Sequence, residues 1–112
     1  MTETMAQDTE LLRWKIATAV RQEDPGGTEG AQELGLLSQN TQFESVEVFD
    51  DELSISEQGF IGPIVWHVVL VYNDPEGEIR QSDSYPGTVT GRIEGENVVV
   101  EHMTADTRSF YR

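Results

Sequence analysis

Residues 60–74, FIGPIVWHVVLVYND, form the most apolar stretch of this 112-residue chain and decide its fold. A membrane-spanning helix needs about 20 apolar residues, whereas the run from Ile64 to Tyr72 is much shorter and includes a histidine. Its β-branched and aromatic residues instead predict a long strand, which ends at the turn-forming sequence DPEG at 74–77. The chain is therefore expected to build a sheet around one central strand.

The two faces of this strand are both apolar, because side chains two residues apart share a face. One face carries Ile64, Trp66, Val68, Leu70 and Tyr72, and the other carries Val65, His67, Val69 and Val71. Both faces should therefore be covered, and a single helix covers only one. We expect the second face to close on a curled half-barrel interior, on residues 28–42, or on a second copy of the chain in a homodimer.

The segments on either side of this strand predict an antiparallel meander. Three alternating segments follow the turn: GEIRQSD at 77–83, TVTGRIE at 88–94 and VVVEHMT at 98–104. Two precede the strand: FESVEVF at 43–49 and ELSISE at 52–57. The Asp50–Asp51 step between these two suits a hairpin, and residues 105–112 suit one more short strand. Gly91 inside a strand indicates a bend, bulge or close approach in a strongly curved sheet.

The N-terminal region predicts the principal helix over residues 5–23. Its apolar residues fall on one stripe at helical spacing: Leu12, Ile16, Ala19 and Val20. Trp14 points away from this stripe, which indicates contact with a second layer or an interface. Pro25 and the two glycines after it end the helix. Residues 28–42 suit a short helix capped by Thr28, or an ordered loop.

These elements predict one α+β domain over residues 1–112, with an N-terminal helix packed on a curved antiparallel β-meander of about six strands. This order of elements resembles the architecture of cystatin-like and nuclear-transport-factor-like cones, with no shared motif. A cone of this kind has an open mouth, where small-molecule pockets often lie.

The charge of the chain is strongly negative, since 21 acids oppose 7 bases and give a net charge of −14. No Lys or Arg occurs between Arg21 and Arg80, a region rich in Asp and Glu. Such a surface repels nucleic acid and anionic membranes. Three interpretations remain open. The acids are a solvated surface suited to a saline cytoplasm, a docking surface for a basic partner, or a cation site at 50–52 or 74–78.

His67 has two interpretations. It is either a general base or ligand group in a pocket, or a neutral histidine satisfied at the sheet surface or a dimer seam, which is the expectation we adopt. The candidate pocket residues are Trp66, His67, Tyr72 and Tyr85. His102 is expected near a strand end at the surface. Two histidines without a fixed short spacing do not form a zinc signature, so we expect no metal.

Sequence signatures of enzymes are absent. The chain has no cysteine, which excludes disulfides and a cysteine nucleophile. It has no glycine-rich phosphate loop with its lysine and no G-x-S-x-G elbow, and nothing in the sequence pairs a serine with a base. We expect no cofactor. No signal-peptide pattern is visible, so we expect a soluble, cytoplasmic protein.

These observations favour a small acidic, non-enzymatic interaction protein with a basic protein partner. The candidate partner-binding residues are Asp50, Asp51, Glu52 and Glu57. The first alternative is a small-molecule-binding or lyase/isomerase-type cone protein with a pocket at His67. The second is an inhibitor that imitates the phosphate track of DNA to bind a basic partner. A subunit of a larger assembly, contacting it through Trp14 and SFYR at 109–112, is the third.

Overall fold

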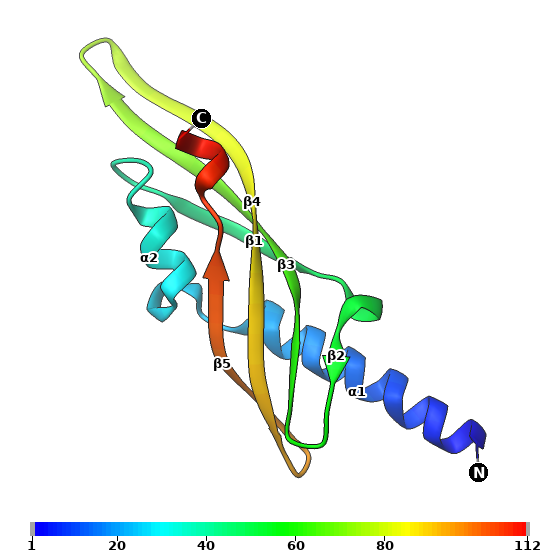
Figure 1. Cartoon of the computed structure of the whole chain (residues 1–112). Coiled ribbons are helices and arrows are strands. Elements are labelled where there is room, and N and C mark those ends of the chain that lie inside the picture. The colour runs from blue at the N-terminus through cyan, green and yellow to red at the C-terminus, as the bar shows by residue number, and fades with distance from the viewer. Residues whose placement is uncertain (1, 112) are drawn as a thin grey trace.

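The computed structural model describes residues 2–111, apart from the side chains of residues 2–9, Pro25 and Tyr111. It is an α+β fold in which helices pack on an antiparallel sheet, as predicted (Figure 1). The helices are α1 (Thr2–Gln22) and α2 (Glu29–Gly35). The strands are β1 (Gln42–Val48), β2 (Ser54–Ile55), β3 (Gly59–Asp74), β4 (Gly77–Glu94) and β5 (Asn97–Ala105). Three 3-10 turns complete the described chain: η1 (Pro25–Gly27), η2 (Asp50–Glu52) and η3 (Arg108–Tyr111).

The sheet has five strands in the order β1-β3-β4-β5, with β2 paired to the start of β3. The sequence predicts about six strands between residues 43 and 104, but the segments at 77–83 and 88–94 form one continuous strand, β4. The further strand expected in the tail is not formed by the described residues, because Arg108–Tyr111 folds into η3. Strand β3 pairs with β4 from Gly59↔Arg92 to Asp74↔Gly77, so the predicted turn at 74–77 is confirmed. Gly77 has a φ of +144°, which residues with side chains rarely adopt.

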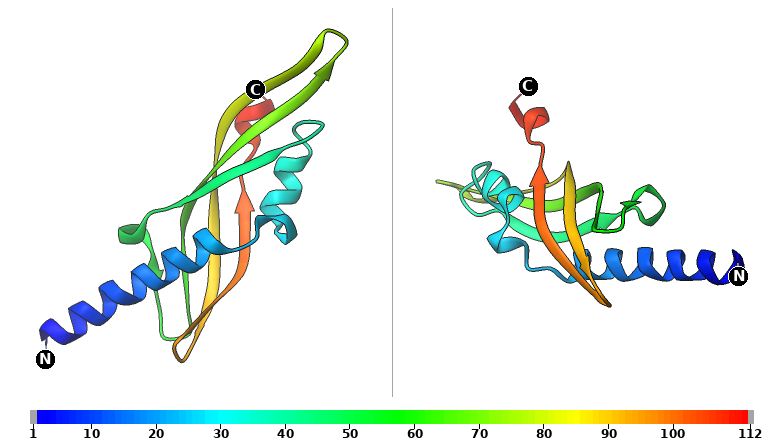
Figure 2. Two further views of the ribbon diagram at one scale, coloured as in Figure 1. Left: turned by 180° about the vertical axis from the view of Figure 1, so that it is seen from behind. Right: turned by 60° about the horizontal axis from the view of Figure 1, so that its bottom comes forward.

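The β3–β4 hairpin is longer than its neighbours in the sheet. Strand β1 pairs only with residues 64–69 of β3, and β5 pairs only with residues 87–94 of β4. Beyond those residues the hairpin continues as an arm that leaves the body of the molecule (Figures 1 and 2). The arm and the projecting start of α1 give the molecule extents of 65 × 23 × 21 Å.

The hairpin expected at Asp50–Asp51 is wrong. Strands β1 and β2 both pair with β3, β1 with Ile64–Val69 and β2 with Phe60–Ile61. The long β3 offers a partner to each, so the residues between them form η2 instead of a two-residue turn. Arg13 on α1 holds this segment, since its Nη1 donates to the carbonyl oxygens of Asp50 at 2.8 Å and Leu53 at 2.6 Å.

One face of the sheet carries the hydrophobic core. Helices α1 and α2 and the residues just after α2 supply its helical half, where the most buried residues are Ile16, Ala17, Val20, Leu34 and Leu37. Of the predicted stripe, Ile16 and Val20 are buried and Leu12 packs against the core, but Ala17 is buried more deeply than Ala19. Strand β3 supplies Ile64, Trp66, Val68 and Leu70, each at most 1 % exposed. The prediction that Thr28 caps a short helix is confirmed, because its Oγ1 accepts from the Ala31 N–H at 3.1 Å.

Gly91 is a point of close approach inside the sheet, as predicted. A Cβ there would lie 2.3 Å from the Val99 carbonyl oxygen and 2.4 Å from Cζ of the Phe60 ring. The register between β4 and β5 also shifts between Thr90 and Gly91. The absent side chain therefore lets Phe60 enter the core where the ladder is irregular.

The outer side of α1 is accessible. Trp14 is 57 % exposed, in agreement with its predicted position away from the apolar stripe. Leu11 beside it is also exposed. Within the described part of the chain, neither helix has the length and apolar character needed to cross a membrane.

Candidate interaction surfaces

The four residues expected to line a pocket lie on two sides of the sheet. Trp66 and Tyr85 are fully buried on the helix-covered face, and Tyr72 packs against the same core. Their polar atoms donate within the structure: Trp66 Nε1 to Thr104 O at 2.9 Å, Tyr72 OH to Leu37 O at 2.9 Å and Tyr85 OH to Asp83 Oδ2 at 2.7 Å. His67 points to the opposite face, because it alternates with Trp66 along β3. The structure does not bring these four side chains together around one cavity.

His67 lies in a hydrogen-bonded row that crosses three strands. Its Nδ1 is 2.9 Å from Ser84 Oγ on β4, and its Nε2 is 3.1 Å from Glu47 Oε1 on β1. The register explains both contacts, since His67 pairs with Ser84 on β4, and Glu47 on β1 pairs with Val65, the preceding residue on the same face of β3. The His67 side chain is 35 % exposed. Both ring nitrogens therefore have partners while the ring edge faces solvent.

The composition of this row, Ser–His–Glu, is also that of a nucleophilic triad. Acyl transfer further needs donors at the developing oxyanion and a pocket for the substrate. The row thus shares the composition of a triad, whereas the backbone N–H of Ser84 donates to Asp83 Oδ1 at 2.9 Å and the two hollows described below are lined by other residues.

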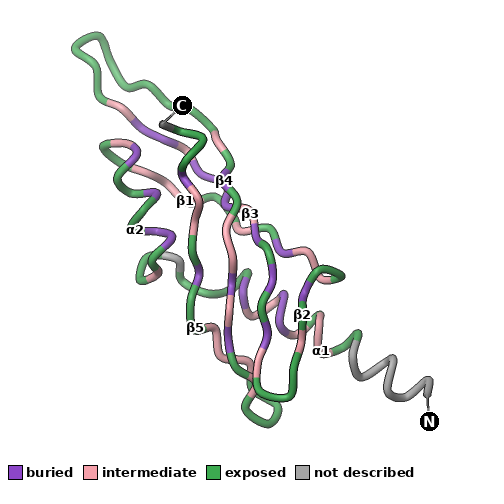
Figure 3. Tube along the Cα trace, in the orientation of Figure 1, coloured by how far each residue is buried: buried purple, intermediate pink, exposed green. Residues whose placement is uncertain are grey.

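The face of β3 that carries His67 is left open by the helices. Its apolar residues form a line that we call the apolar ridge: Ile61, Pro63, Val65 and Val69. Ile61 is 49 % exposed and Pro63 is exposed, while Val65 and Val69 are half-buried. Figure 3 shows the alternation along β3 between buried residues and more accessible ones. Within residues 2–111, the second face of the strand is therefore left without full cover from Ile61 to Val69, whereas Val71, further along the same face, is buried.

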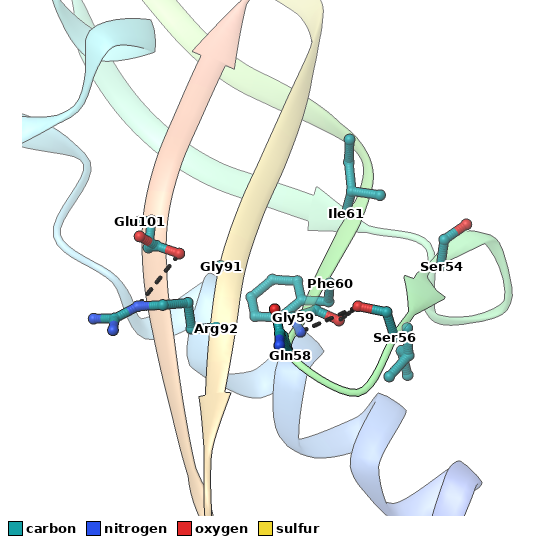
Figure 4. Close-up of a pocket in the computed structure, with 10 residues that line it drawn as sticks. Ser54, Ser56, Gln58, Gly59, Phe60, Ile61, Gly91, Arg92 and Glu101 are labelled. Atoms are coloured by element: carbon teal, nitrogen blue, oxygen red, sulfur yellow. Dashed lines mark hydrogen bonds and ion pairs between the residues drawn. The ribbon is translucent and has the colours of Figure 1, made fainter.

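A hollow of about 440 Å³ lies at the start of β3 (Figure 4). Its wall includes Gly59, Ile61, Arg92 and Glu101. Arg92 is the partner of Gly59 on β4, and a Cβ on Gly59 would collide with the backbone carbonyl oxygen of Gly91. Arg92 binds two carboxylates, with Nη1 2.7 Å from Glu94 Oε1 and Nε 3.4 Å from Glu101 Oε1. The apolar ridge thus ends at a hollow in whose wall Arg92 and Glu101 form an ion pair.

The predicted partner-binding acids occupy two neighbouring turns. Asp50, Asp51 and Glu52 form η2, and Glu57 lies in the turn before β3. Asp51, Glu52 and Glu57 are exposed, whereas Asp50 is 3.4 Å from Nη2 of Arg21 on α1.

A second hollow, of about 430 Å³, lies between α1 and η2. It is lined by Glu10, Arg13, Asp50 and Asp51. Sequence analysis did not single out Glu10, because nothing in the sequence shows that α1 crosses η2. Helix α1 therefore adds the carboxylate of Glu10 to those of Asp50 and Asp51 around this hollow.

The arginines of the described chain are engaged within it. Arg13 binds backbone carbonyls, and the other four pair with carboxylates: Arg21 with Asp50, Arg80 with Glu78, Arg92 with Glu94 and Arg108 with Asp106. The hydrogen bond and charge of Asp106 raise the pKa of Arg108. Most of the positive charge is thus paired locally, and the surplus of acids faces solvent.

His102 also pairs with an acid. Its Nδ1 is 2.8 Å from Oε1 of Glu29, the first residue of α2, so the contact joins α2 to β5. The hydrogen bond that His102 donates to Glu29, together with the charge of Glu29, raises the pKa of His102 above its ordinary value. The sequence places His102 at the surface near a strand end, which agrees with its exposure.

The two segments considered for a cation lie in turns, with Asp74 Oδ1 accepting from the Glu76 N–H at 2.9 Å. Among the residues that the structure describes, no three His, Cys, Asp or Glu side chains are grouped as metal ligands.

Comparison of the chain with protein-family models, with curated proteins and with solved structures gives no match.

Proposed function

We propose that this protein is a non-enzymatic interaction protein that binds a basic protein partner at the hollow between α1 and η2. The observation that carries the proposal is the placement of Glu10, Asp50 and Asp51 around one hollow of about 430 Å³. Arg13, the base among the lining residues, is held by the carbonyl groups of Asp50 and Leu53. The hollow thus presents carboxylates to an incoming positive charge.

The surroundings of the hollow favour the same kind of partner. Glu52 and Glu57 are exposed close to it along the chain, and the whole protein carries a net charge of −14. A lysine or arginine of a partner would enter between Glu10 and Asp51, while the outer acids speed the encounter. Contacts of this type depend strongly on ionic strength, because they lie at the surface.

A matched pair of charge-reversal variants tests the proposal. The first changes Asp51, Glu52 and Glu57 to Lys and keeps Asp50, which is bound to Arg21. The control changes Glu33, Glu44 and Glu76 to Lys, which are exposed acids elsewhere on the surface. Both variants change the net charge equally. Binding of a short lysine-rich peptide is then measured by fluorescence anisotropy against KCl concentration.

We expect the wild-type protein to bind the peptide at low salt and to weaken as KCl rises. The variant with Lys at positions 51, 52 and 57 should lose at least about tenfold more affinity for the peptide than the control variant. One or two close charge pairs account for a factor of this size. Equal losses in the two variants would contradict the proposal, because binding would then follow net charge alone.

Two further explanations of the negative charge can be tested with the same proteins. If the basic partner is a DNA-binding protein, the acids stand in for phosphates, and duplex DNA should compete with this protein for that partner. If the acids serve instead to keep the protein folded in a saline cytoplasm, its free energy of unfolding should fall at low KCl and recover toward about 2 M KCl. A stable protein at low salt would leave partner binding as the reason for the charge.

A further inference from the structure

We infer that the open face of the sheet is the interface of a homodimer, in which the apolar ridge of one copy packs against that of the second. This inference goes beyond the proposed function, since it concerns the opposite side of β3 from the helices and a different occupant. Four features of the face carry it: its charge, its satisfied polar groups, its shape and its size.

The charge of the face is the first feature. Two copies with a net charge of −14 repel each other unless they meet where acids are few. The outward residues of β3 from Ile61 to Val69 include no acid. The outward residues of β4 beside them are Ser82, Ser84, Pro86, Thr88, Thr90 and Arg92, again without an acid. A basic partner would gain little from such a surface, whereas a second copy gains most from it.

The hydrogen-bonded row at His67 is the second feature. A polar group that is buried without a partner costs about 1–3 kcal/mol. His67 already binds Ser84 and Glu47, and Glu47 is an acid that β1 contributes to this face, opposite Val65. A second copy can therefore cover the row without leaving its ring nitrogens unpaired, and the carboxylate of Glu47 faces a histidine rather than another acid.

The shape of the face is the third feature. Ile61 is half exposed and stands at the wall of the hollow at the start of β3 (Figure 4). A knob beside a hollow is self-complementary under a two-fold axis, because each copy offers both. The hollow of about 440 Å³ is large enough to receive the Ile61 side chain of the second copy.

The size of the face is the fourth feature. Strands β3 and β4 contribute about ten residues each, whereas β1 lies beside residues 64–69 of β3 and β5 beside residues 87–94 of β4. With a rise of about 3.3 Å per residue and about 4.8 Å between strands, the footprint is roughly 500 Å². A stable interface of standard size buries about 800 Å² per partner, so we expect a weak dimer, with a dissociation constant in the micromolar range.

Sedimentation equilibrium against KCl concentration tests the inference. We expect a monomer at low salt and a dimer at about 1 M KCl, where the Debye length falls to about 3 Å and the repulsion between copies is screened. This salt dependence is opposite to that of the proposed basic partner, so the failure of one idea is distinguishable from the failure of the other. A wild-type protein that stays monomeric at about 200 µM in 1 M KCl would overturn the inference.

Two variants locate the interface. Val65→Glu and Ile61→Glu each place a charge on the apolar ridge, and each should weaken dimerisation at 1 M KCl at least about tenfold. Ile61 is the more exposed of the two positions, so Ile61→Glu is expected to fold even if Val65→Glu does not, and its dimerisation can still be measured. Leu36→Glu is the matched control, because Leu36 is 76 % exposed and lies just after α2. A dimer that resists both ridge variants, or that is lost with Leu36→Glu, would contradict the inference.

Discussion

The two faces of β3 differ in what they contact, although their sequences look alike. Trp66 and His67 are neighbours in the chain, yet Trp66 is fully buried beneath the helices and His67 is partly open to solvent. Val68 is buried on the first face, while Val65 is only half-buried on the second. The difference arises because α1 and α2 both pack on the same side of the sheet.

This comparison separates two uses of apolar residues. On the covered face they stabilise the fold through burial within one chain. On the open face they contribute little to the isolated chain and remain available for association. Substitutions on the first face should therefore change the free energy of unfolding, and substitutions on the second should change binding.

The largest expected effect comes from a pair of substitutions at adjacent positions of β3. Trp66→Ala removes a fully buried side chain and should lower the free energy of unfolding by about 3–5 kcal/mol. Val65→Ala lies on the open face and should lower it by less than about 1 kcal/mol at low salt, where the chain is expected to be monomeric. Urea unfolding followed by circular dichroism measures both. Similar losses in the two variants would mean that the open face is already covered within one chain.

A smaller effect is expected at the glycines. Gly91→Ala places a Cβ about 2.3 Å from the Val99 carbonyl oxygen and 2.4 Å from the Phe60 ring, so it should cost about 1–3 kcal/mol. Gly35→Ala at the end of α2 is the control, since nothing lies within 4 Å of the added Cβ. The control should be neutral or stabilising by up to about 1 kcal/mol, because alanine favours helix. Thermal unfolding of the two variants checks this, and a stable Gly91→Ala protein would contradict the close approach of Phe60.

The smallest effect is expected at the His102–Glu29 contact on the edge of the sheet. Because Glu29 raises the folded pKa of His102, the contact stabilises the protein below about pH 6.5 and loses this contribution as pH rises through the folded pKa. Glu29→Gln should therefore narrow the stability difference between about pH 5.5 and pH 8.5, while Glu33→Gln on the same helix should not. Thermal unfolding at the two pH values measures the change. Equal pH dependence in both variants would show that the contact does not form in solution.

Much of the fold follows from local sequence patterns. The length of β3, the turn at 74–77, the stripe of α1 and the special position of Gly91 are each visible in short windows of residues. The α+β class and the antiparallel pairing follow from these. The local pattern failed at Asp50–Asp51, because the choice between a hairpin and two separate pairings depends on the distant strand β3.

The candidate surfaces follow from the sequence only in part. Asp51, Glu52 and Glu57 are exposed as a run of acids suggests, but Glu10 joins the hollow only because α1 crosses η2. The partners of His67 are Glu47 and Ser84, which are 20 and 17 residues away along the chain. A shift of one residue in either register would separate them. The turn at 74–77 sets the register of β4 against β3, whereas no tight turn joins β1 to β3.

The most direct test of the account is an NMR comparison of backbone amide shifts in the wild-type protein at low and high KCl, at several protein concentrations. The account predicts concentration-dependent shifts at high salt that cluster at Ile61, Val65, His67 and their β4 neighbours, while the amides of α1 and α2 stay unchanged. Shifts centred on Trp14 or Leu36, or no dependence on concentration, would contradict the claim that one face of the sheet holds the fold together and the other is free to bind.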